Sequence, residues 1–105
     1  NNNLQIDGRI DEVNSPYPID KKFEAFNFHV INIDGHDFDQ IAAAFKEARE
    51  TKGMPTAIIA KTIKGKGVSF MEDQAGWHGN APNDEETKIA LAELAAQCAS
   101  VNGVK

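Results

Sequence analysis

The chain has 105 residues and a formal net charge of −5, and its 41% hydrophobic and 26% charged residues are typical of a globular protein. This length allows one small domain, the lack of a long apolar run excludes a membrane span, and the acidic balance argues against nucleic-acid binding. The single cysteine, Cys98, excludes an internal disulfide, so we expect a cytoplasmic protein.

The first 33 residues predict an irregular segment, a short helix and a buried strand. Residues 1–20 show no apolar periodicity, and "IDG" is a turn signal. Residues 20–26 predict a helix with Asp20 as its N-cap. The β-branched and aromatic run 28–33 is typical of a buried strand. We therefore expect regular structure to begin only near Asp20.

A longer amphipathic helix is predicted over residues 38–51. Asp37 is expected to cap its start, and Gly53 followed by Pro55 is expected to end it. Apolar residues recur at i, i+3 and i+4 spacing, so they share one face, which we expect to be buried. The residues of this face are Phe38, Ile41, Ala42, Phe45 and Ala48.

The second half of the sequence predicts another strand and a final helix. Residues 56–62 form an apolar run without polar alternation, as in a parallel strand that is covered on both faces. Asn83 and Glu86 form a capping-box pattern at the start of the last helix. The helix then continues toward residue 98, and residues 99–105 are expected to fray. Its expected buried stripe consists of Leu91, Leu94, Ala95 and Cys98.

These elements predict an α/β protein with part of a doubly wound parallel sheet flanked by helices. Two parallel strands joined by a right-handed crossover leave sheet edges unpaired, so we expect further strands from outside this chain. We assign residues 1–98 to this partial domain and interpret "NNNLQIDG" as the end of a strand and the loop after it. Ligands of such sheets bind at the carboxyl ends of the strands. This loop and "KTIKGKG" are therefore expected to face one site.

Positive charge gathers in one stretch of this acidic chain. Residues 51–71 contain four lysines and no acid. A lysine run alone is more often a solvated loop. However, Gly65 and Gly67 allow the backbone to approach a ligand, and exposed loop amides with lysine ammonium groups suit phosphate oxygens. The stretch therefore favours an anionic ligand.

Three stretches of the sequence carry a resemblance to a known family. "NNLQIDGRIDEV", "KKFEAFNFHVINIDGHDFDQIAAAFKEA" and "KTIKGKGVSFMEDQAGWHGNAPNDEE" resemble the later part of the diphosphate-binding domain of transketolase, in particular the N-terminal subunit of the split bacterial form. The resemblance runs from Asn2 to about Leu94. The family's Gly-Asp-Gly, which opens the thiamine diphosphate motif, has no match here. The resemblance therefore implies a partial thiamine diphosphate-binding fold with only half of its metal site.

The resemblance implies roles for individual residues. Asn2, through its side-chain oxygen, and Leu4, through its carbonyl oxygen, match ligands of Mg²⁺ or Ca²⁺, which prefer oxygen donors. Lys64 matches a lysine that contacts the diphosphate. His78 matches a histidine that hydrogen-bonds the diphosphate and the donor sugar, and it is the implied catalytic residue. The other implied cofactor-binding residues are Ile6 and Ile63, which would pack against the cofactor, and Gly65 in the loop.

Other polar residues are interpreted structurally. His29 is expected to pack within its strand. Glu72 and Asp73 are interpreted as solvated or helix-capping acids. Ser69 and Lys66 are interpreted as residues that order the lysine-rich loop. No zinc-ligand spacing and no arrangement of a nucleophile with a histidine is recognised.

The complete enzyme that the resemblance implies is a transketolase of the pentose phosphate pathway. It transfers a two-carbon ketol unit from a ketose phosphate to an aldose phosphate, and thiamine diphosphate serves as the electron sink. The glutamate that activates the cofactor lies in another domain, across a dimer interface. The implied partners are sugar phosphates, a missing N-terminal segment and a C-terminal transketolase subunit, in a homo- or hetero-oligomer. The isolated chain is expected to be inactive and to bind the cofactor negligibly.

Three alternatives remain open. A related thiamine diphosphate enzyme, of the deoxyxylulose phosphate synthase or dihydroxyacetone synthase type, shares the cofactor loop. A non-catalytic interaction subunit that retains the fold could dock on a partner through its bare sheet edges. A phosphate-binding α/β module unrelated to thiamine would depend on the short KGKG pattern, which is weak evidence.

Overall fold

The computed structural model describes residues 1–102, which form two compact units. Unit 1 comprises residues 1–3 and 10–62, and unit 2 comprises residues 4–9 and the described residues from 63 onward. Each unit has its own small core, with Ala44 and Ala57 buried in unit 1 and Val68 and Ala90 buried in unit 2. No described helix is both long and apolar enough to cross a bilayer.

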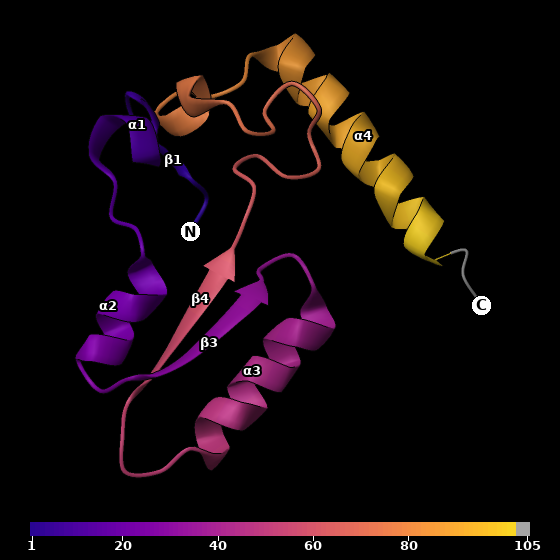
Figure 1. The fold of residues 1–105 in the computed structure, drawn as a ribbon. Helices are drawn as coiled ribbons and strands as arrows, with labels where there is room; N and C mark the ends of the chain where they lie inside the picture. The colour runs from indigo at the N-terminus through magenta and orange to yellow at the C-terminus, as the bar shows by residue number, and fades with distance from the viewer. Residues whose placement is uncertain (103–105) are drawn as a thin grey trace. The chain divides into compact units, whose positions relative to one another are not determined.

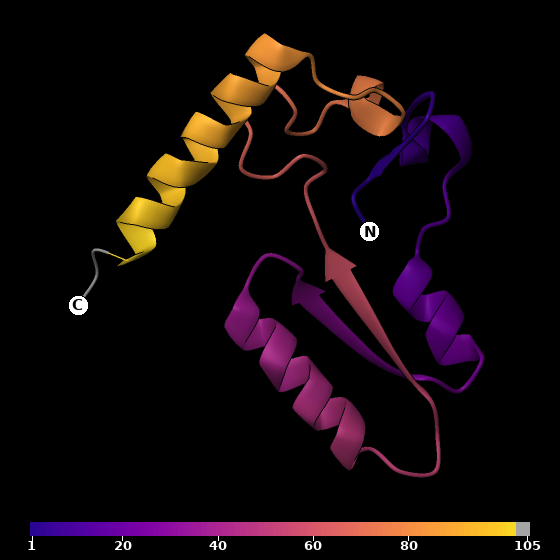
Figure 2. The ribbon, with the colours of Figure 1, turned by 180° about the vertical axis from the view of Figure 1, so that it is seen from behind.

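Unit 1 contains the predicted parallel strand pair. β3 (His29–Asp34) and β4 (Thr56–Lys61) are hydrogen-bonded in parallel along their whole length. α2 (Ile19–Ala25) and α3 (Phe38–Glu50) both contact β3, and Figures 1 and 2 show them on either side of the strand pair. Both strands and α3 lie within one residue of their predicted bounds. The predicted α/β class with a partial parallel sheet is thus confirmed.

Asn1 lies at the outer edge of β4. Its amino group donates a hydrogen bond to the carbonyl oxygen of Ala60 at 2.8 Å, and its own carbonyl oxygen accepts one from the amide of Thr62 at 2.9 Å. Two bonds that straddle one residue are the pattern of a parallel neighbouring strand. Asn1 therefore occupies the position of a strand residue beside the carboxyl end of β4, as the sequence predicts.

The start of α3 is fixed by the predicted cap. The carboxylate of Asp37 accepts hydrogen bonds from the amides of Asp39 and Gln40 at 2.9 and 3.1 Å. The amide and then the side chain of Gln40 are the main causes that lower the pKa of Asp37. The charged carboxylate therefore also suits the positive end of the helix dipole.

The buried face of α3 differs from the predicted one. Ala44 is only 2% exposed, and Ile41 and Ala48, three residues before and four after it, are half-buried. These side chains lie on one face, and the two alanines are small enough to let the helix approach the sheet closely. The exposed members of the predicted face are Phe38, Ala42 and Phe45. They remain exposed because two strands are too narrow to cover both apolar edges of the helix.

The first residues form more regular structure than the sequence predicts. β1 (Leu4–Gln5) and β2 (Gly8–Arg9) form an antiparallel hairpin, with the predicted turn at Ile6 and Asp7. The short helix α1 (Ile10–Asn14) follows. The prediction of an irregular segment is wrong because strands of two residues and a helix of five are too short to show a period.

The predicted cap of α2 is wrong. The helix begins at Ile19 after Pro18, and no side chain accepts a hydrogen bond at its start. Asp20 lies inside the first turn instead. Pro18 occupies the N-cap position in an extended conformation, so the helix begins two residues earlier than a cap at Asp20 would allow.

Unit 2 contains the β1–β2 hairpin, the 3₁₀ helix η1 (Ala75–His78) and α4 (Asp84–Asn102) (Figure 1). The predicted capping box of α4 is confirmed. The amide of Glu86 donates to Oδ1 of Asn83 at 2.9 Å, and Oε2 of Glu86 accepts from the amide of Asn83 at 2.8 Å. α4 includes residues 99–102, which the sequence expects to fray, whereas 103–105 lie outside the described residues.

The predicted apolar stripe of α4 is not buried. Leu91 is 62% exposed, and Leu94, Ala95 and Cys98 are exposed as well. The buried side chain is that of Ala90. It shares a face with residues 93 and 97, three and seven positions later, so α4 directs a largely polar face toward its own unit.

Candidate functional site

Most of the site residues that the sequence predicts belong to unit 2. They are Leu4, Ile6, Ile63, Lys64, Gly65 and His78. β1, which carries the predicted metal-binding carbonyl, is in contact with η1, which ends in the predicted catalytic histidine. Asn2 belongs to unit 1. Its convergence with the other residues therefore stays a prediction.

Residues 63–74 form a closed loop, which we call the lysine–glycine loop. The amide of Asp73 donates to the carbonyl oxygen of Lys64 at 2.9 Å, and this bond joins the two ends of the loop. The amide of Glu72 donates to the carbonyl oxygen of Val68 at 3.0 Å. The Val68 side chain is buried. The loop therefore has a fixed backbone with an apolar anchor.

Gly65 is required by the loop itself. Its φ is +70°, a conformation that favours glycine. A Cβ atom at this position would lie only 2.5 Å from the carbonyl oxygen of Met71. The sequence predicts that a ligand approaches the backbone at Gly65, but in the structure the backbone of Met71 lies there instead. A contact between Gly65 and the cofactor stays a prediction.

Two amides of the loop are occupied by carboxylates of the chain. The amide of Gly67 donates to Oε1 of Glu72 at 2.9 Å, and the amide of Ser69 donates to Oε2 of Glu93 at 2.6 Å. The prediction of exposed loop amides for phosphate is therefore wrong at these two positions. The interpretation of Glu72 as a solvated acid is wrong for the same reason. The predicted ordering role of Ser69 is confirmed.

The two lysines at the centre of the loop differ in their surroundings. Nζ of Lys66 lies 3.4 Å from Oε1 of Glu72, so its charge is partly compensated, and its predicted ordering role is confirmed. The ion pairs within residues 1–102 include none with Lys64. Lys64 is therefore the cation that this loop offers to an anionic ligand.

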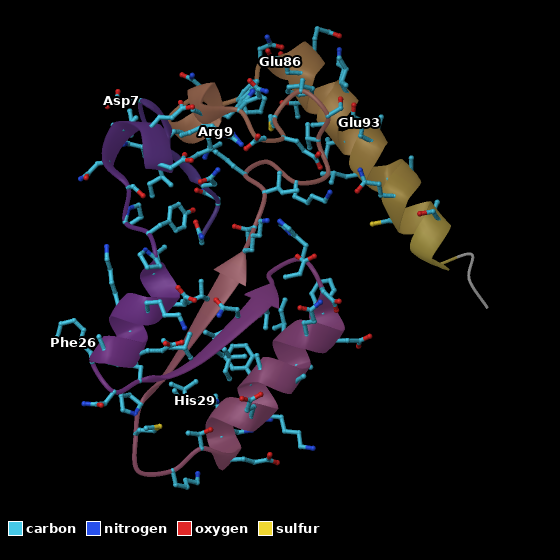
Figure 3. All side chains as sticks on the ribbon, in the orientation of Figure 1. Asp7, Arg9, Phe26, His29, Glu86 and Glu93 are labelled. Atoms are coloured by element: carbon cyan, nitrogen blue, oxygen red, sulfur yellow. The ribbon has the colours of Figure 1, made fainter. Side chains whose placement is uncertain are left out.

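An ion pair joins the β1–β2 hairpin to the loop. Nη1 of Arg9 lies 3.1 Å from Oδ2 of Asp73, and Figure 3 labels Arg9 on the hairpin. Asp73 is exposed, as predicted for a solvated acid, but it also has an ion-pair partner that the sequence does not indicate. Sequence reasoning missed this pair because the two residues are 64 positions apart and no local pattern relates them.

A tryptophan fixes the segment that carries His78. Nε1 of Trp77 donates to the carbonyl oxygen of Phe70 at 3.1 Å, and the two rings lie 5.5 Å apart. The side chain of His78, the next residue, is exposed. The 3₁₀ helix η1 is therefore held against the lysine–glycine loop while its histidine remains accessible.

Two apolar residues of the predicted site are exposed. Ile6, in the hairpin turn, is 67% exposed, and Ile63, at the start of the lysine–glycine loop, is exposed too. Large apolar side chains at these positions do not contribute to the described cores. Packing against a bound cofactor would explain why both side chains are exposed in this chain. This packing stays a prediction.

The asparagines beside Asn2 have a partner that sequence reasoning missed. The hydroxyl of Tyr17 lies 2.9 Å from Oδ1 of Asn1 and 3.1 Å from Oδ1 of Asn3. These three residues, with Lys61 and Thr62, line a cavity of about 350 Å³ within unit 1. The isolated tyrosine in "SPYP" gives no sequence signal for this contact.

The described residues supply few metal donors. Residues 1–102 contain no group of three or more histidines, cysteines or acids that could hold a metal ion. The amide oxygen of Asn2 and the carbonyl oxygen of Leu4 are hard oxygen donors that suit Mg²⁺ or Ca²⁺. A complete coordination shell would need ligands from elsewhere, such as phosphate oxygens.

Comparison with known sequences finds a family match over nearly the whole chain. Residues 1–100 match the family described as transketolase, thiamine diphosphate binding domain. Over 93 residues, the chain is 43% identical to the 6-deoxy-6-sulfo-D-fructose transketolase subunit of Clostridium sp. (strain MSTE9). Over 93 residues, it is 37% identical to an apulose-4-phosphate transketolase subunit of Actinobacillus succinogenes. These alignments cover 89% of this chain but only 34% and 33% of the relatives.

A solved structure has the same fold. Transketolase from Campylobacter jejuni superposes with a TM-score of 0.82 at 32% sequence identity. The match covers 90% of this chain and 15% of the other. The chain therefore spans about a third of the two bacterial subunits and a smaller part of a full-length relative.

Proposed function

The chain belongs to the transketolase family, through its thiamine diphosphate-binding domain, and we propose that it forms the diphosphate side of a site for ketol transfer. The observation that carries this proposal is the placement of Lys64. It is the loop cation without an ion pair among the described residues, and it lies in a closed loop of the unit that also carries His78.

The residues of unit 2 suit a diphosphate. The ammonium group of Lys64 would pair with phosphate oxygens. An imidazole has two ring nitrogens that can each take part in a hydrogen bond, so the ring of His78 would join a phosphate oxygen to a substrate hydroxyl. Thiamine diphosphate, when bound, supplies the electron sink for cleavage of the ketose carbon–carbon bond. The chain's own residues bind and orient its charged end.

We propose Mg²⁺ or Ca²⁺ as the counterion of the diphosphate. Asn2 would contribute its amide oxygen and Leu4 its carbonyl oxygen, and the phosphates and a further protein group would complete the shell. Ile6 and Ile63 would pack against the cofactor. Both are exposed in this chain and would be covered on binding.

We propose that the remaining parts of the enzyme come from other segments or a partner subunit. Two relatives are named as transketolase subunits, and this chain spans about a third of each. Phe38 is 84% exposed on α3 and Leu91 is 62% exposed on α4, so both helices carry apolar surface for such a contact. We expect the isolated chain to bind the cofactor negligibly in calorimetry with Mg²⁺. A cytoplasmic location and an oligomer that contains a dimer interface are part of the same proposal.

Sugar phosphates are the proposed substrates. The relatives named above act, by their names, on a sulfonated ketose and on apulose 4-phosphate, so ketol donors differ within the family. A donor panel therefore tests the substrate class. It contains xylulose 5-phosphate, apulose 4-phosphate and 6-deoxy-6-sulfo-D-fructose, each with ribose 5-phosphate as acceptor.

The test of the proposed function uses the assembled enzyme. His78→Ala should lower kcat/KM for the best donor by roughly 10- to 100-fold, since it loses hydrogen bonds to charged groups. His29→Ala is the control, because His29 is the first residue of β3 in unit 1 and its Nε2 bonds Oε1 of Glu47. Unchanged ketol transfer by an assembled His78→Ala enzyme would contradict the proposal and favour a scaffold role.

A further inference from the structure

The lysine–glycine loop is fastened to α4 by three hydrogen bonds. The amide and the hydroxyl of Ser69 donate to Oε2 and Oε1 of Glu93, both at 2.6 Å. Nε2 of Gln97 donates to the carbonyl oxygen of Gly67 at 2.7 Å. Glu93 and Gln97 are four residues apart and lie on one face of α4, and Figure 3 labels Glu93 on this helix.

The loop and the helix approach each other closely at Gly67. A Cβ atom on Gly67 would lie 3.1 Å from Cδ2 of Leu94 and 3.3 Å from Oε1 of Gln97. Its φ of +96° also favours glycine. The lack of space for a side chain at Gly67 therefore shows, independently of the hydrogen bonds of Glu93 and Gln97, that the loop and α4 are in close contact.

A chain of backbone bonds connects this contact to Lys64. The amide of Val68 donates to the carbonyl oxygen of Gly65 at 3.2 Å, and the amide of Asp73 donates to the carbonyl oxygen of Lys64 at 2.9 Å. The residues held by α4 therefore belong to the same closed ring as Lys64. A displacement of Ser69 would therefore also displace Lys64, because the bond between Asp73 and Lys64 keeps the two ends of the loop together.

The carboxylate of Glu93 forms a strong contact with Ser69. Two donors of Ser69 satisfy both of its oxygens, and a hydrogen bond to an ionised group is stronger than one between neutral groups. With the amide of Ser69 bonded to Glu93 and that of Gly67 bonded to Glu72, these amides are not available to phosphate. The loop would therefore bind an anion mainly through the side chain of Lys64.

We propose that Glu93 and Gln97 are positioning residues for the cofactor site, which hold the lysine–glycine loop so that Lys64 meets the diphosphate. This inference rests on the proposed function, because it concerns the same site. It adds that residues of α4, which do not contact the cofactor themselves, determine how tightly the cofactor binds.

The test measures cofactor binding and turnover separately in the assembled enzyme. The variants are Glu93→Gln and Ser69→Ala, and Ser69→Thr keeps both donors and should behave as wild type. We expect the first two to raise the dissociation constant of thiamine diphosphate by roughly five- to tenfold, which is less than the loss of a direct hydrogen bond between the cofactor and a charged group would cause. Turnover at saturating cofactor should stay within about twofold of wild type. Glu85→Gln is the matched control, since Glu85 lies on the same helix and pairs with Lys88.

Hydrogen exchange of residues 63–74 reports the loop in the same samples. Faster exchange in Glu93→Gln together with weaker cofactor binding supports the proposal. Faster exchange with unchanged binding overturns it, because the contact would then stabilise the loop without positioning Lys64. Unchanged exchange also overturns it. If Lys64→Ala binds the cofactor as wild type in this assay, the proposed function of Lys64 fails instead, so the two failures are distinguishable.

Discussion

The indole nitrogen of Trp77 donates a hydrogen bond to the carbonyl oxygen of Phe70 at 3.1 Å, while the two rings contact each other at 5.5 Å. One residue thus joins η1 to the lysine–glycine loop through a polar and an aromatic contact. Because His78 follows Trp77 directly, the orientation of the histidine depends on this pair.

Replacing Trp77 by phenylalanine separates the two contacts. Trp77→Phe keeps an aromatic ring against Phe70 but removes the indole donor and leaves a carbonyl oxygen without its partner. We expect a loss of about 1 kcal/mol in the free energy of unfolding, measured by urea denaturation of the purified chain. A loss below about 0.3 kcal/mol would show that the hydrogen bond does not hold η1.

Two glycines with positive φ offer a matched comparison. Gly65 and Gly53 have φ values of +70° and +79°, but a Cβ atom would meet the backbone of Met71 at Gly65 and nothing within 4 Å at Gly53. Both alanine variants carry the left-handed penalty of about 1–2 kcal/mol. Gly65→Ala should cost a further 1–3 kcal/mol, roughly, because its side chain overlaps fixed backbone atoms. Equal unfolding free energies for the two variants would contradict the described loop.

The capping box of α4 gives a prediction for the last helix. Asn83→Ala removes the acceptor of the Glu86 amide and should destabilise the chain by about 0.5–2 kcal/mol. Asn83→Asp keeps an acceptor and should stay close to wild type. Circular dichroism during thermal unfolding measures both variants. An alanine variant as stable as the aspartate variant would show that the cap contributes nothing.

Glu93 predicts a dependence of stability on pH. The hydroxyl and then the amide of Ser69 lower the pKa of Glu93 below its usual value of 4.5, while desolvation and then the charge of Glu72 oppose this shift. Because the folded pKa is the lower one, the stabilisation is fully present above pH 4.5 and is lost as the pH falls through the folded pKa. Urea midpoints of wild type and Glu93→Gln should therefore differ at neutral pH and approach each other as the pH falls from 4.5 through the lower, folded pKa. A constant difference across this window would contradict the described bonds.

Local patterns were sufficient to predict most elements of the fold. Both long strands and α3 followed from runs and periods of apolar residues, and the caps at Asp37 and Asn83 from short motifs. The buried faces of α3 and α4 could not be predicted in this way. Periodicity shows which side chains share a face, but it does not show whether another element covers that face.

The candidate site was predicted in part. The family motifs placed Lys64 and His78 in segments that the structure assigns to one unit. The pairs that shape this unit could not be predicted. Arg9 with Asp73, and Ser69 with Glu93, are 64 and 24 positions apart, and no local pattern relates them. The family resemblance had already favoured Lys64 over Lys66, and the structure adds that Lys66 pairs with Glu72, whereas the ion pairs within residues 1–102 include none with Lys64.

The dissociation constant of thiamine diphosphate for assembled Lys64→Ala and Lys66→Ala enzymes, at fixed Mg²⁺, tests the central claim most directly. Removing the ammonium group of Lys64 should cost about 1.5–3 kcal/mol of binding, a rise of roughly 10- to 150-fold. Lys66→Ala should change the constant by less than about threefold, because Lys66 already pairs with Glu72. Wild-type binding by Lys64→Ala, or an equal loss in both variants, would contradict the account.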